Sequence, residues 1–242
     1  MIIALALLAA AAPDPAAWDV ILKKHVLDNG TVRYAGLKQD SGALERYVSA
    51  IGEVSPQSHP ALFPSREARL AYWLNAYNAL VISAIVKDYP EKRDRLISAW
   101  GKITFFYRMK FRTGGQMRTL DDIEKNTIRA EFKDPRIHFA IVCGSTGCPW
   151  LSRDVFTAAN VEAMLERETR RYMGQERNVK VDHGKKELTV SEIFKWMRED
   201  FGKSEPDVLR FIAKYRLDGQ SFAGGGWKIK YFPYDWSLNE AK

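Results

Sequence analysis

The chain has few residues of the kinds that usually carry catalytic or metal chemistry. Of its 242 residues, two are cysteine and four are histidine, and the 16 glycines and 10 prolines follow no period. It lacks a Gly-x-Ser-x-Gly motif, a His-Glu-x-x-His motif and a glycine-rich phosphate loop before a helix. These absences exclude the common signatures of serine hydrolases, zinc proteases and nucleotide-binding enzymes, and we expect neither a metal ion nor a cofactor.

The chain also has no strong excess of charge of one sign. The 37 lysines and arginines against 30 aspartates and glutamates give a net charge of +7, but the two signs are mixed along the chain. No cluster of basic residues stands out, so we expect no nucleic-acid partner. A mild preference for anionic surfaces, such as a cell envelope, is all that this charge implies.

Only the first residues form a long apolar run. Residues 1–12 read MIIALALLAAAA and are followed by Pro13 and Pro15. The run is too short to cross a bilayer as a helix, but it matches the apolar centre and small-residue end of a secretory signal without its basic leader. We predict a signal peptide over residues 1–12 and a periplasmic or secreted protein with no stable membrane insertion. The alternative is an N-terminal helical turn in the core.

The rest of the sequence predicts one helix-rich α+β domain over residues 15–240, because 46% hydrophobic and 12% aromatic residues suffice for a large core. The longest helix is expected from its N-cap Ser65 to the Tyr89-Pro90 pair. It is apolar nearly all round, which makes it a long buried central helix. A small, mainly antiparallel sheet completes the fold. We expect further helices near residues 15–26, 44–51, 119–132, 157–172, 191–196 and after a capping box at 204–207, and strands at 137–143, 179–181, 188–190 and 228–234.

Two polar residues, Asn75 and Asn78, interrupt the central helix. A buried amide costs free energy unless it finds hydrogen-bond partners, so both side chains must bond to something specific. We interpret them as ties to the backbone of a neighbouring loop. A role in catalysis is the alternative.

One short loop carries both cysteines. Residues 137–143 are predicted to form a buried strand, and residues 144–147 separate Cys143 from Cys148. Because rigid elements often present functional loops, this loop is the strongest candidate site. An exported protein can keep a Cys143–Cys148 disulfide, although so small a ring contributes only about 2 kcal/mol of stability.

Three other interpretations of the loop are open. Cys143 could be a nucleophile with His138 as its base, although residues five apart on a regular strand face opposite sides. Cys143, Cys148 and His138 could bind a metal ion with Glu124 or Asp235 as a fourth ligand, but this spacing matches no common zinc pattern. The cysteine pair could also exchange disulfides with a partner, although its spacing is longer than Cys-x-x-Cys.

Six segments together resemble one known family. They are AYWLNAYNAL (71–80), LDDIE (120–124), DPRIHFA (134–140), CGSTGCP (143–149), SEIFKW (191–196) and YDWSLN (234–239). In this order they are similar to the domain-of-unknown-function family 547, and the resemblance spans roughly residues 18–239.

The resemblance implies no activity, because the family is named for the lack of an assigned one. Similar domains include exported bacterial proteins and parts of larger plant and animal proteins, some with a glutaredoxin-like module, which favours thiol chemistry. The positions that belong to the family pattern and are kept here are Cys143 and His138, and the predicted binding residues Asn75, Glu124, Arg136 and Cys148.

We predict from this a thiol-dependent site that transfers acyl groups or hydrolyses amides of a peptide or cell-envelope substrate. Cys143 is the predicted nucleophile and His138 its base, with Asn75 or Glu124 orienting the imidazole. The protein would then be a cysteine-dependent hydrolase or transferase. The alternative is a non-catalytic exported binding domain with a structural Cys143–Cys148 disulfide.

Overall fold

The structure is a computed structural model that describes residues 11–222 and 225–241. Helices make up 52% and strands 12% of the described residues, so the prediction of a helix-rich α+β fold is confirmed. No helix in the described part is long and apolar enough to cross a membrane. Residues 1–10 of the predicted signal peptide lie outside the described residues.

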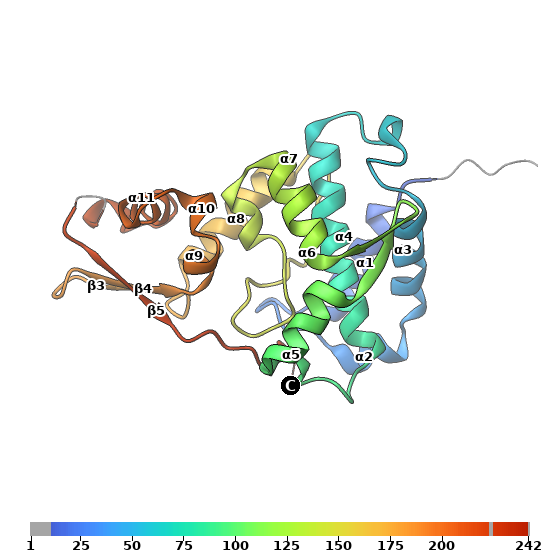
Figure 1. The fold of residues 1–242 in the computed structure, drawn as a ribbon, viewed down its shortest axis with the longest axis horizontal. Coiled ribbons are helices and arrows are strands. Elements are labelled where there is room, and N and C mark those ends of the chain that lie inside the picture. The colour runs from blue at the N-terminus through green and yellow to red at the C-terminus, as the bar shows by residue number, and fades with distance from the viewer. Residues whose placement is uncertain (1–10, 223–224, 242) are drawn as a thin grey trace, which may run out of the picture.

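Helices and strands follow one another along the chain as Figure 1 shows. The α-helices are α1 (Pro15–His25), α2 (Tyr34–Gln39), α3 (Gly42–Glu53), α4 (Arg66–Lys87), α5 (Ala99–Lys102), α6 (Leu120–Ile123), α7 (Ala130–Phe132), α8 (Val161–Met173), α9 (Ile193–Trp196), α10 (Arg198–Phe201) and α11 (Glu205–Tyr215). The strands are β1 (Lys110–Thr113), β2 (Gln116–Thr119), β3 (Val179–Asp182), β4 (Glu187–Ser191) and β5 (Lys228–Phe232). The shorter turns are 3₁₀ helices η1 (Pro60–Leu62), η2 (Arg95–Ile97), η5 (Pro135–Phe139) and η6 (Gly219–Ser221), and π-helical turns η3 (Ile103–Arg108) and η4 (Glu124–Arg129).

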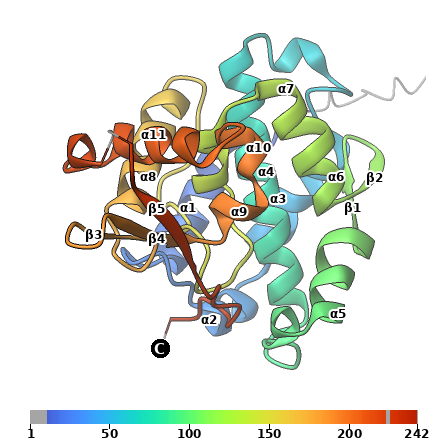
Figure 2. The same cartoon turned by 60° about the vertical axis from the view of Figure 1, so that its left-hand side comes forward.

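Helix α4 runs through the larger, helical part of the molecule (Figures 1 and 2). It begins at the predicted cap, where Ser65 Oγ accepts a hydrogen bond from the Ala68 N–H at 3.0 Å. Every residue from 70 to 82 is buried, because α1, α2, α3, α6 and α8 all pack against it. A helix covered on all faces needs apolar residues all round, as the sequence has them. The long buried central helix is confirmed.

Two small sheets complete the fold. Strands β1 and β2 form an antiparallel hairpin that turns at Gly114 and Gly115, both with positive φ. In the other sheet β4 lies between β3 and β5 and pairs antiparallel with β3 and parallel with β5. The predicted strands at 179–181, 188–190 and 228–234 are therefore confirmed, whereas the sequence analysis did not anticipate the first hairpin.

Buried apolar side chains form two clusters. The first surrounds α4 and reaches from Trp18 to Leu165. The second lies among the end of α8, the sheet β3–β4–β5 and α9 to α11. Phe139 connects them: it belongs to η5, whose Ile137 packs in the first cluster, yet its ring lies 4.7 Å from that of Tyr172 in the second. The assignment of residues 15–240 to a single domain stays a prediction.

The predicted strand over residues 137–143 is wrong. Residues 135–139 form the 3₁₀ turn η5, and the backbone after it is irregular. A helical start is favoured here because Asp134 Oδ1 accepts the Arg136 N–H at 2.9 Å and Pro135 occupies the first position of the turn. The apolar side chains of this run are buried among helices. A short apolar run fits this environment as well as it fits a buried strand, so the sequence pattern does not distinguish the two.

Candidate functional site

Both asparagines of α4 hold loop backbone, as we interpreted them. Asn78 Nδ2 donates to the carbonyl of Ala140, and its Oδ1 accepts the N–H of Val142, both at 2.9 Å. Asn75 pairs in the same way with Phe156, donating to its carbonyl at 2.7 Å and accepting from its N–H at 3.1 Å. A side-chain amide thus replaces the strand partner that these backbone groups would otherwise need. Asn78 thereby fixes the backbone directly before the cysteine loop.

Cys143 and Cys148 lie at disulfide distance, with their Cα atoms 6.2 Å apart. Their sulfur atoms have different surroundings. Cys148 is buried, and its sulfur accepts the backbone N–H of Cys143 at 2.8 Å. Cys143 is half-buried, and its sulfur lies 2.9 Å from Ser145 Oγ and 3.4 Å from Tyr234 Oη. The pair is therefore asymmetric: the half-buried Cys143 has two hydroxyls beside its sulfur, and the buried Cys148 has a peptide N–H beside its sulfur.

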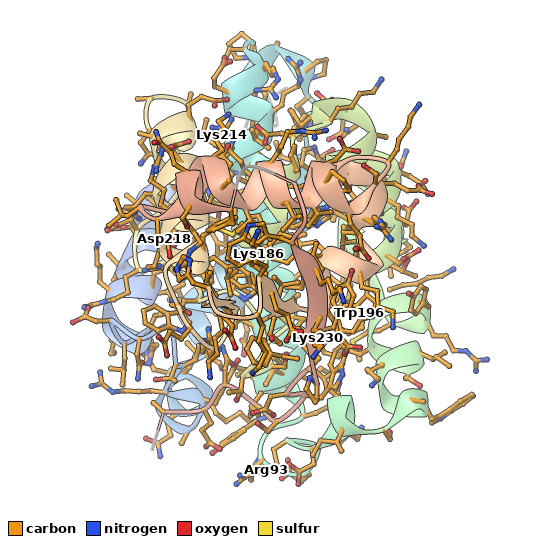
Figure 3. The ribbon with its side chains drawn as sticks, turned by 90° about the vertical axis from the view of Figure 1, so that its left-hand side faces the viewer. Arg93, Lys186, Trp196, Lys214, Asp218 and Lys230 are labelled. Atoms are coloured by element: carbon orange, nitrogen blue, oxygen red, sulfur yellow. A yellow bond between two sulfur atoms is a disulfide. The ribbon has the colours of Figure 1, made fainter. Side chains whose placement is uncertain are left out.

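The Tyr234 hydroxyl is a proton donor at neutral pH. Burial raises the pKa of Tyr234, so its hydroxyl keeps its proton. The Tyr234 ring also packs against Trp196 and Trp236, with ring centroids 4.9 and 4.6 Å away. Trp196 is 43% exposed on the face of the molecule seen in Figure 3. These three residues form an aromatic wall that adjoins the Cys143 sulfur.

The end of the chain holds the cysteine loop in place. The N–H of Thr146 donates to the carbonyl of Ser237 at 2.7 Å, and the N–H of Asn239 donates to the carbonyl of Gly144 at 3.0 Å. Arg177 adds hydrogen bonds to two loop carbonyls. Gly144 itself has φ +82°, a conformation that glycine adopts without strain. Several hydrogen bonds therefore fix the backbone of the loop.

His138 belongs to a different group of polar residues. Its imidazole is buried, and Nε2 lies 2.6 Å from Asp200 Oδ2. Arg129 binds both oxygens of the same carboxylate, through Nε at 2.7 Å and Nη2 at 3.1 Å. Burial by itself raises the pKa of Asp200, but the hydrogen bonds from His138 and Arg129 outweigh it and lower the pKa to about 2. Asp200 is thus a carboxylate that orients the imidazole.

Glu124 lies beside this group and accepts the Tyr77 hydroxyl at 3.3 Å. Burial raises the pKa of Glu124, and the nearby His138 and Arg129 offset part of that rise. Glu124 and Arg129 are the two ends of η4, the π-helical turn that continues α6 after its predicted cap at Thr119. Such turns are frequent at functional sites.

A polar cavity of about 180 Å³ adjoins this group. Its lining residues are Arg129, Lys133, Asp134, Ile137, Glu199 and Asp200. A larger hollow, of about 790 Å³, lies between α1 and α8 and includes none of the predicted site residues. Size alone therefore does not locate the site.

Arg136 has a structural role in these contacts. Its guanidinium binds Asp134 within η5, and Nη2 lies 2.6 Å from Glu162 Oε2 of α8. These ion pairs fasten η5 to α8. Among residues 11–222 and 225–241, no three histidine, cysteine, aspartate or glutamate side chains converge as a metal site, and the metal interpretation of the cysteine loop gains no support.

The structure divides the six predicted site residues among three places. Cys143 and Cys148 form the disulfide, His138 and Glu124 share the group around Asp200, and Asn75 and Arg136 hold backbone and helices elsewhere. No hydrogen bond joins His138 to Cys143 in the described part of the chain. The sequence analysis missed Asp200, which is 62 positions from His138 and has no spacing signal. Tyr234 and Ser145, by contrast, stand within the motifs that carry the resemblance.

Comparison with known proteins identifies part of the chain. No curated protein and no solved structure matches it significantly. All six predicted site residues lie between residues 62 and 173, whereas Asp200 and Tyr234 lie beyond them. Residues 62–173 match the model of the family described as Protein of unknown function, DUF547, and this part of the chain is therefore a domain of that family.

Proposed function

We propose that the protein exchanges disulfides with a partner at the Cys143–Cys148 pair, outside the reducing cytosol. The asymmetry of the pair carries this proposal. A partner thiol can reach the half-buried Cys143 sulfur, whereas the Cys148 sulfur is enclosed and accepts a peptide N–H at 2.8 Å. One sulfur is thus suited to be attacked and the other to leave.

The exchange begins when a partner thiolate attacks Cys143 Sγ. A bond forms between the partner's sulfur and Cys143, the bond to Cys148 breaks, and its electron pair stays on Cys148 as a thiolate. The N–H of Cys143 already points at that sulfur and stabilises the charge.

A second thiolate of the partner then attacks the partner's own sulfur in the mixed disulfide. Cys143 leaves as a thiolate beside the hydroxyls of Ser145 and Tyr234, which can donate hydrogen bonds to it. The partner dithiol loses two electrons and becomes a disulfide, and the protein's disulfide becomes two thiols after proton uptake. The aromatic wall offers apolar contact area for the partner segment that carries the reacting thiol.

The extracytosolic location belongs to the same proposal. Disulfides persist in the periplasm and outside the cell, and residues 1–12 have the pattern of a secretory signal. A periplasmic or secreted protein would meet partner thiols there in an oxidising compartment.

A non-catalytic exported binding domain is the second candidate function. Residues 235–239 form hydrogen bonds to the backbone of the cysteine loop and fix it. A structural disulfide would stabilise such a fixed loop, which favours this second candidate. Acyl transfer by Cys143 would first require reduction of the disulfide. It would also require a base other than His138 Nε2, which Asp200 holds.

The redox potential of the pair separates these functions. Purified protein is equilibrated with glutathione buffers, quenched by alkylation and weighed intact. An exchange site is expected to titrate between roughly −120 and −270 mV, whereas a structural disulfide titrates below about −300 mV. A value in the lower range would contradict the exchange proposal.

Single-cysteine variants test the assigned roles. In Cys148→Ser the remaining Cys143 thiol is expected to form a mixed disulfide with oxidised glutathione at least about tenfold faster than the Cys148 thiol of Cys143→Ser, because Cys148 is enclosed. In the Cys148→Ser background, Tyr234→Phe is expected to raise the pKa of the Cys143 thiol, measured by the pH dependence of alkylation. Equal reactivity of the two single-cysteine variants would remove the basis for the proposal.

A further inference from the structure

Exposed apolar side chains gather in one segment of the chain. Among the described residues nine large apolar side chains are exposed, and five of them lie between residues 97 and 117. The five are Ile97, Trp100, Ile103, Tyr107 and Met117. Single exposed apolar residues are ordinary on protein surfaces, but a group of this size marks an interaction surface.

The backbone explains why the five side chains lie together. Helix α5 and the π turn η3 form one continuous helical stretch directly after η2. Trp100, Ile103 and Tyr107 recur every three or four positions and share one side of this stretch, whereas Ile97 lies just before it, in η2. The other side is anchored in the core by Phe105, which is fully buried. Strand β2, which carries Met117, packs against η3.

The same segment carries positive charges only, a local excess that the charge analysis of the whole sequence overlooked. Residues 95–120 contain six lysines and arginines and no aspartate or glutamate, compared with a net charge of +7 for the whole chain. Arg95, Arg112 and Arg118 pair with carboxylates outside the segment. Lys102, Arg108 and Lys110 form no ion pair with any carboxylate in the described part of the chain.

Two of the unpaired charges lie over aromatic rings, the exposed Trp100 and the half-buried Trp236. The Arg108 guanidinium lies 4.6 Å from the centroid of the Trp100 ring, and the Lys102 ammonium lies 4.1 Å from that of Trp236. Figures 1 and 2 both show α5 at the lower end of the molecule, away from α11. Positive charge, indole and aliphatic side chains therefore share one peripheral surface.

We propose that this surface, the basic apolar patch, docks on a lipid bilayer that contains anionic lipids. It comprises the five exposed apolar residues together with Lys102, Arg108 and Lys110. Tryptophan and tyrosine prefer the headgroup region, aliphatic side chains enter the acyl boundary below it, and basic residues pair with anionic headgroups. Docking here would be peripheral, and it agrees with the lack of a membrane-crossing helix in the described residues.

Charge and composition favour a bilayer over other occupants. A second copy of the chain would bring the same positive patch against itself, which repels. A nucleic acid would use the basic residues and the tryptophan but would leave two isoleucines and a methionine in water. An anionic bilayer accommodates all of these side chains at once.

Vesicle binding by the full chain tests the proposal. Oxidised protein is sedimented with vesicles of phosphatidylcholine alone or with 30% phosphatidylglycerol, at low and high salt. We expect binding at least about tenfold tighter to the anionic vesicles, weakened by salt. The variant Lys102→Gln/Arg108→Gln/Lys110→Gln is expected to lose about tenfold or more of this affinity, and Trp100→Ser/Ile103→Ser to lose binding to both kinds of vesicle.

Matched controls assign the effect to this surface. The variant Lys180→Gln/Lys203→Gln/Lys228→Gln removes three exposed lysines elsewhere, and Val20→Ser/Leu217→Ser removes two exposed apolar side chains elsewhere. Both control variants should bind vesicles like the parent. Every variant keeps the apolar residues 1–12, so that any binding by these residues is the same in all the proteins that are compared. Melting temperatures check that each variant is folded.

Three outcomes would overturn the proposal. One is equal binding to neutral and anionic vesicles, and another is an equal loss of binding in the control variants. The third is an affinity for single-stranded DNA or for a second copy of the chain that the patch variants abolish while vesicle binding is unchanged. Because the test uses the oxidised protein without a thiol partner, its result is independent of the proposed disulfide exchange.

Discussion

Replacing Asn78 by alanine removes a side chain that carries two buried backbone hydrogen bonds. Its amide pairs with the Ala140 carbonyl and the Val142 N–H, each at 2.9 Å, and Asn78 itself is only 2% exposed. The change leaves one carbonyl and one N–H buried without a partner, and each costs about 1–3 kcal/mol. We expect the free energy of unfolding to fall by about 2–6 kcal/mol, a large share of the 5–15 kcal/mol that is typical of a domain.

Urea unfolding of the oxidised protein, followed by circular dichroism, measures this loss. The matched variant Asn75→Ala breaks the equivalent pair of bonds to Phe156 and should destabilise to a similar extent. The two variants should differ in the rate at which dithiothreitol reduces the disulfide, because only Asn78 holds the backbone next to the cysteine loop. A loss below about 1 kcal/mol in Asn78→Ala, or equal reduction rates in both variants, would refute this reasoning.

Three further changes have defined outcomes. The pKa of Asp200 is lowered to about 2, so its partly exposed carboxylate stabilises the folded protein above pH 4 by about 1–2 kcal/mol. This contribution is lost as the pH falls to 2, and Asp200→Asn should flatten that part of the stability profile in acid titrations. Gly144→Ala should lower the melting temperature and cost about 1–3 kcal/mol, because φ is +82° and the added Cβ would lie 2.3 Å from Ile85 Cδ1. Cys143→Ser/Cys148→Ser should lose about 2 kcal/mol against the oxidised parent in urea, and no difference would show that this ring does not constrain the unfolded chain.

Local signals predicted most of the helices. The cap at Ser65 and the capping box at residues 204–207 mark true helix starts, because both partners of each cap bond lie within a few positions of one another. The prediction of a strand at 137–143 was wrong because the backbone here bonds to a side chain and not to a neighbouring strand. That side chain is Asn78, which lies 64 positions before Val142. The periodicity of apolar residues indicates which side chains are buried. It does not indicate which distant group bonds to the backbone.

The sequence predicted only those parts of the candidate site whose residue type is rare and chemically distinctive. Two cysteines separated by a short glycine-rich loop form a pair, and the structure contains that pair. The carboxylate that holds His138 was not predictable, because Asp200 is one of many acids and only the fold brings it to the imidazole. The spacing of Trp100, Ile103 and Tyr107 is also what a core-facing helix would show, so only the structure reveals that this face is exposed.

The contacts of the chain's end with the cysteine loop have a consequence for biosynthesis. Ser237 Oγ bonds to Thr146 across 91 positions, so the loop leaves the ribosome long before the residues that clamp it. A chain that folds as it emerges therefore exposes Cys143 and Cys148 in a loop held on one side only. The oxidants and isomerases of the compartment can act on both cysteines during that interval, whereas after residues 235–239 have docked, exchange is restricted to a partner that reaches the half-buried Cys143.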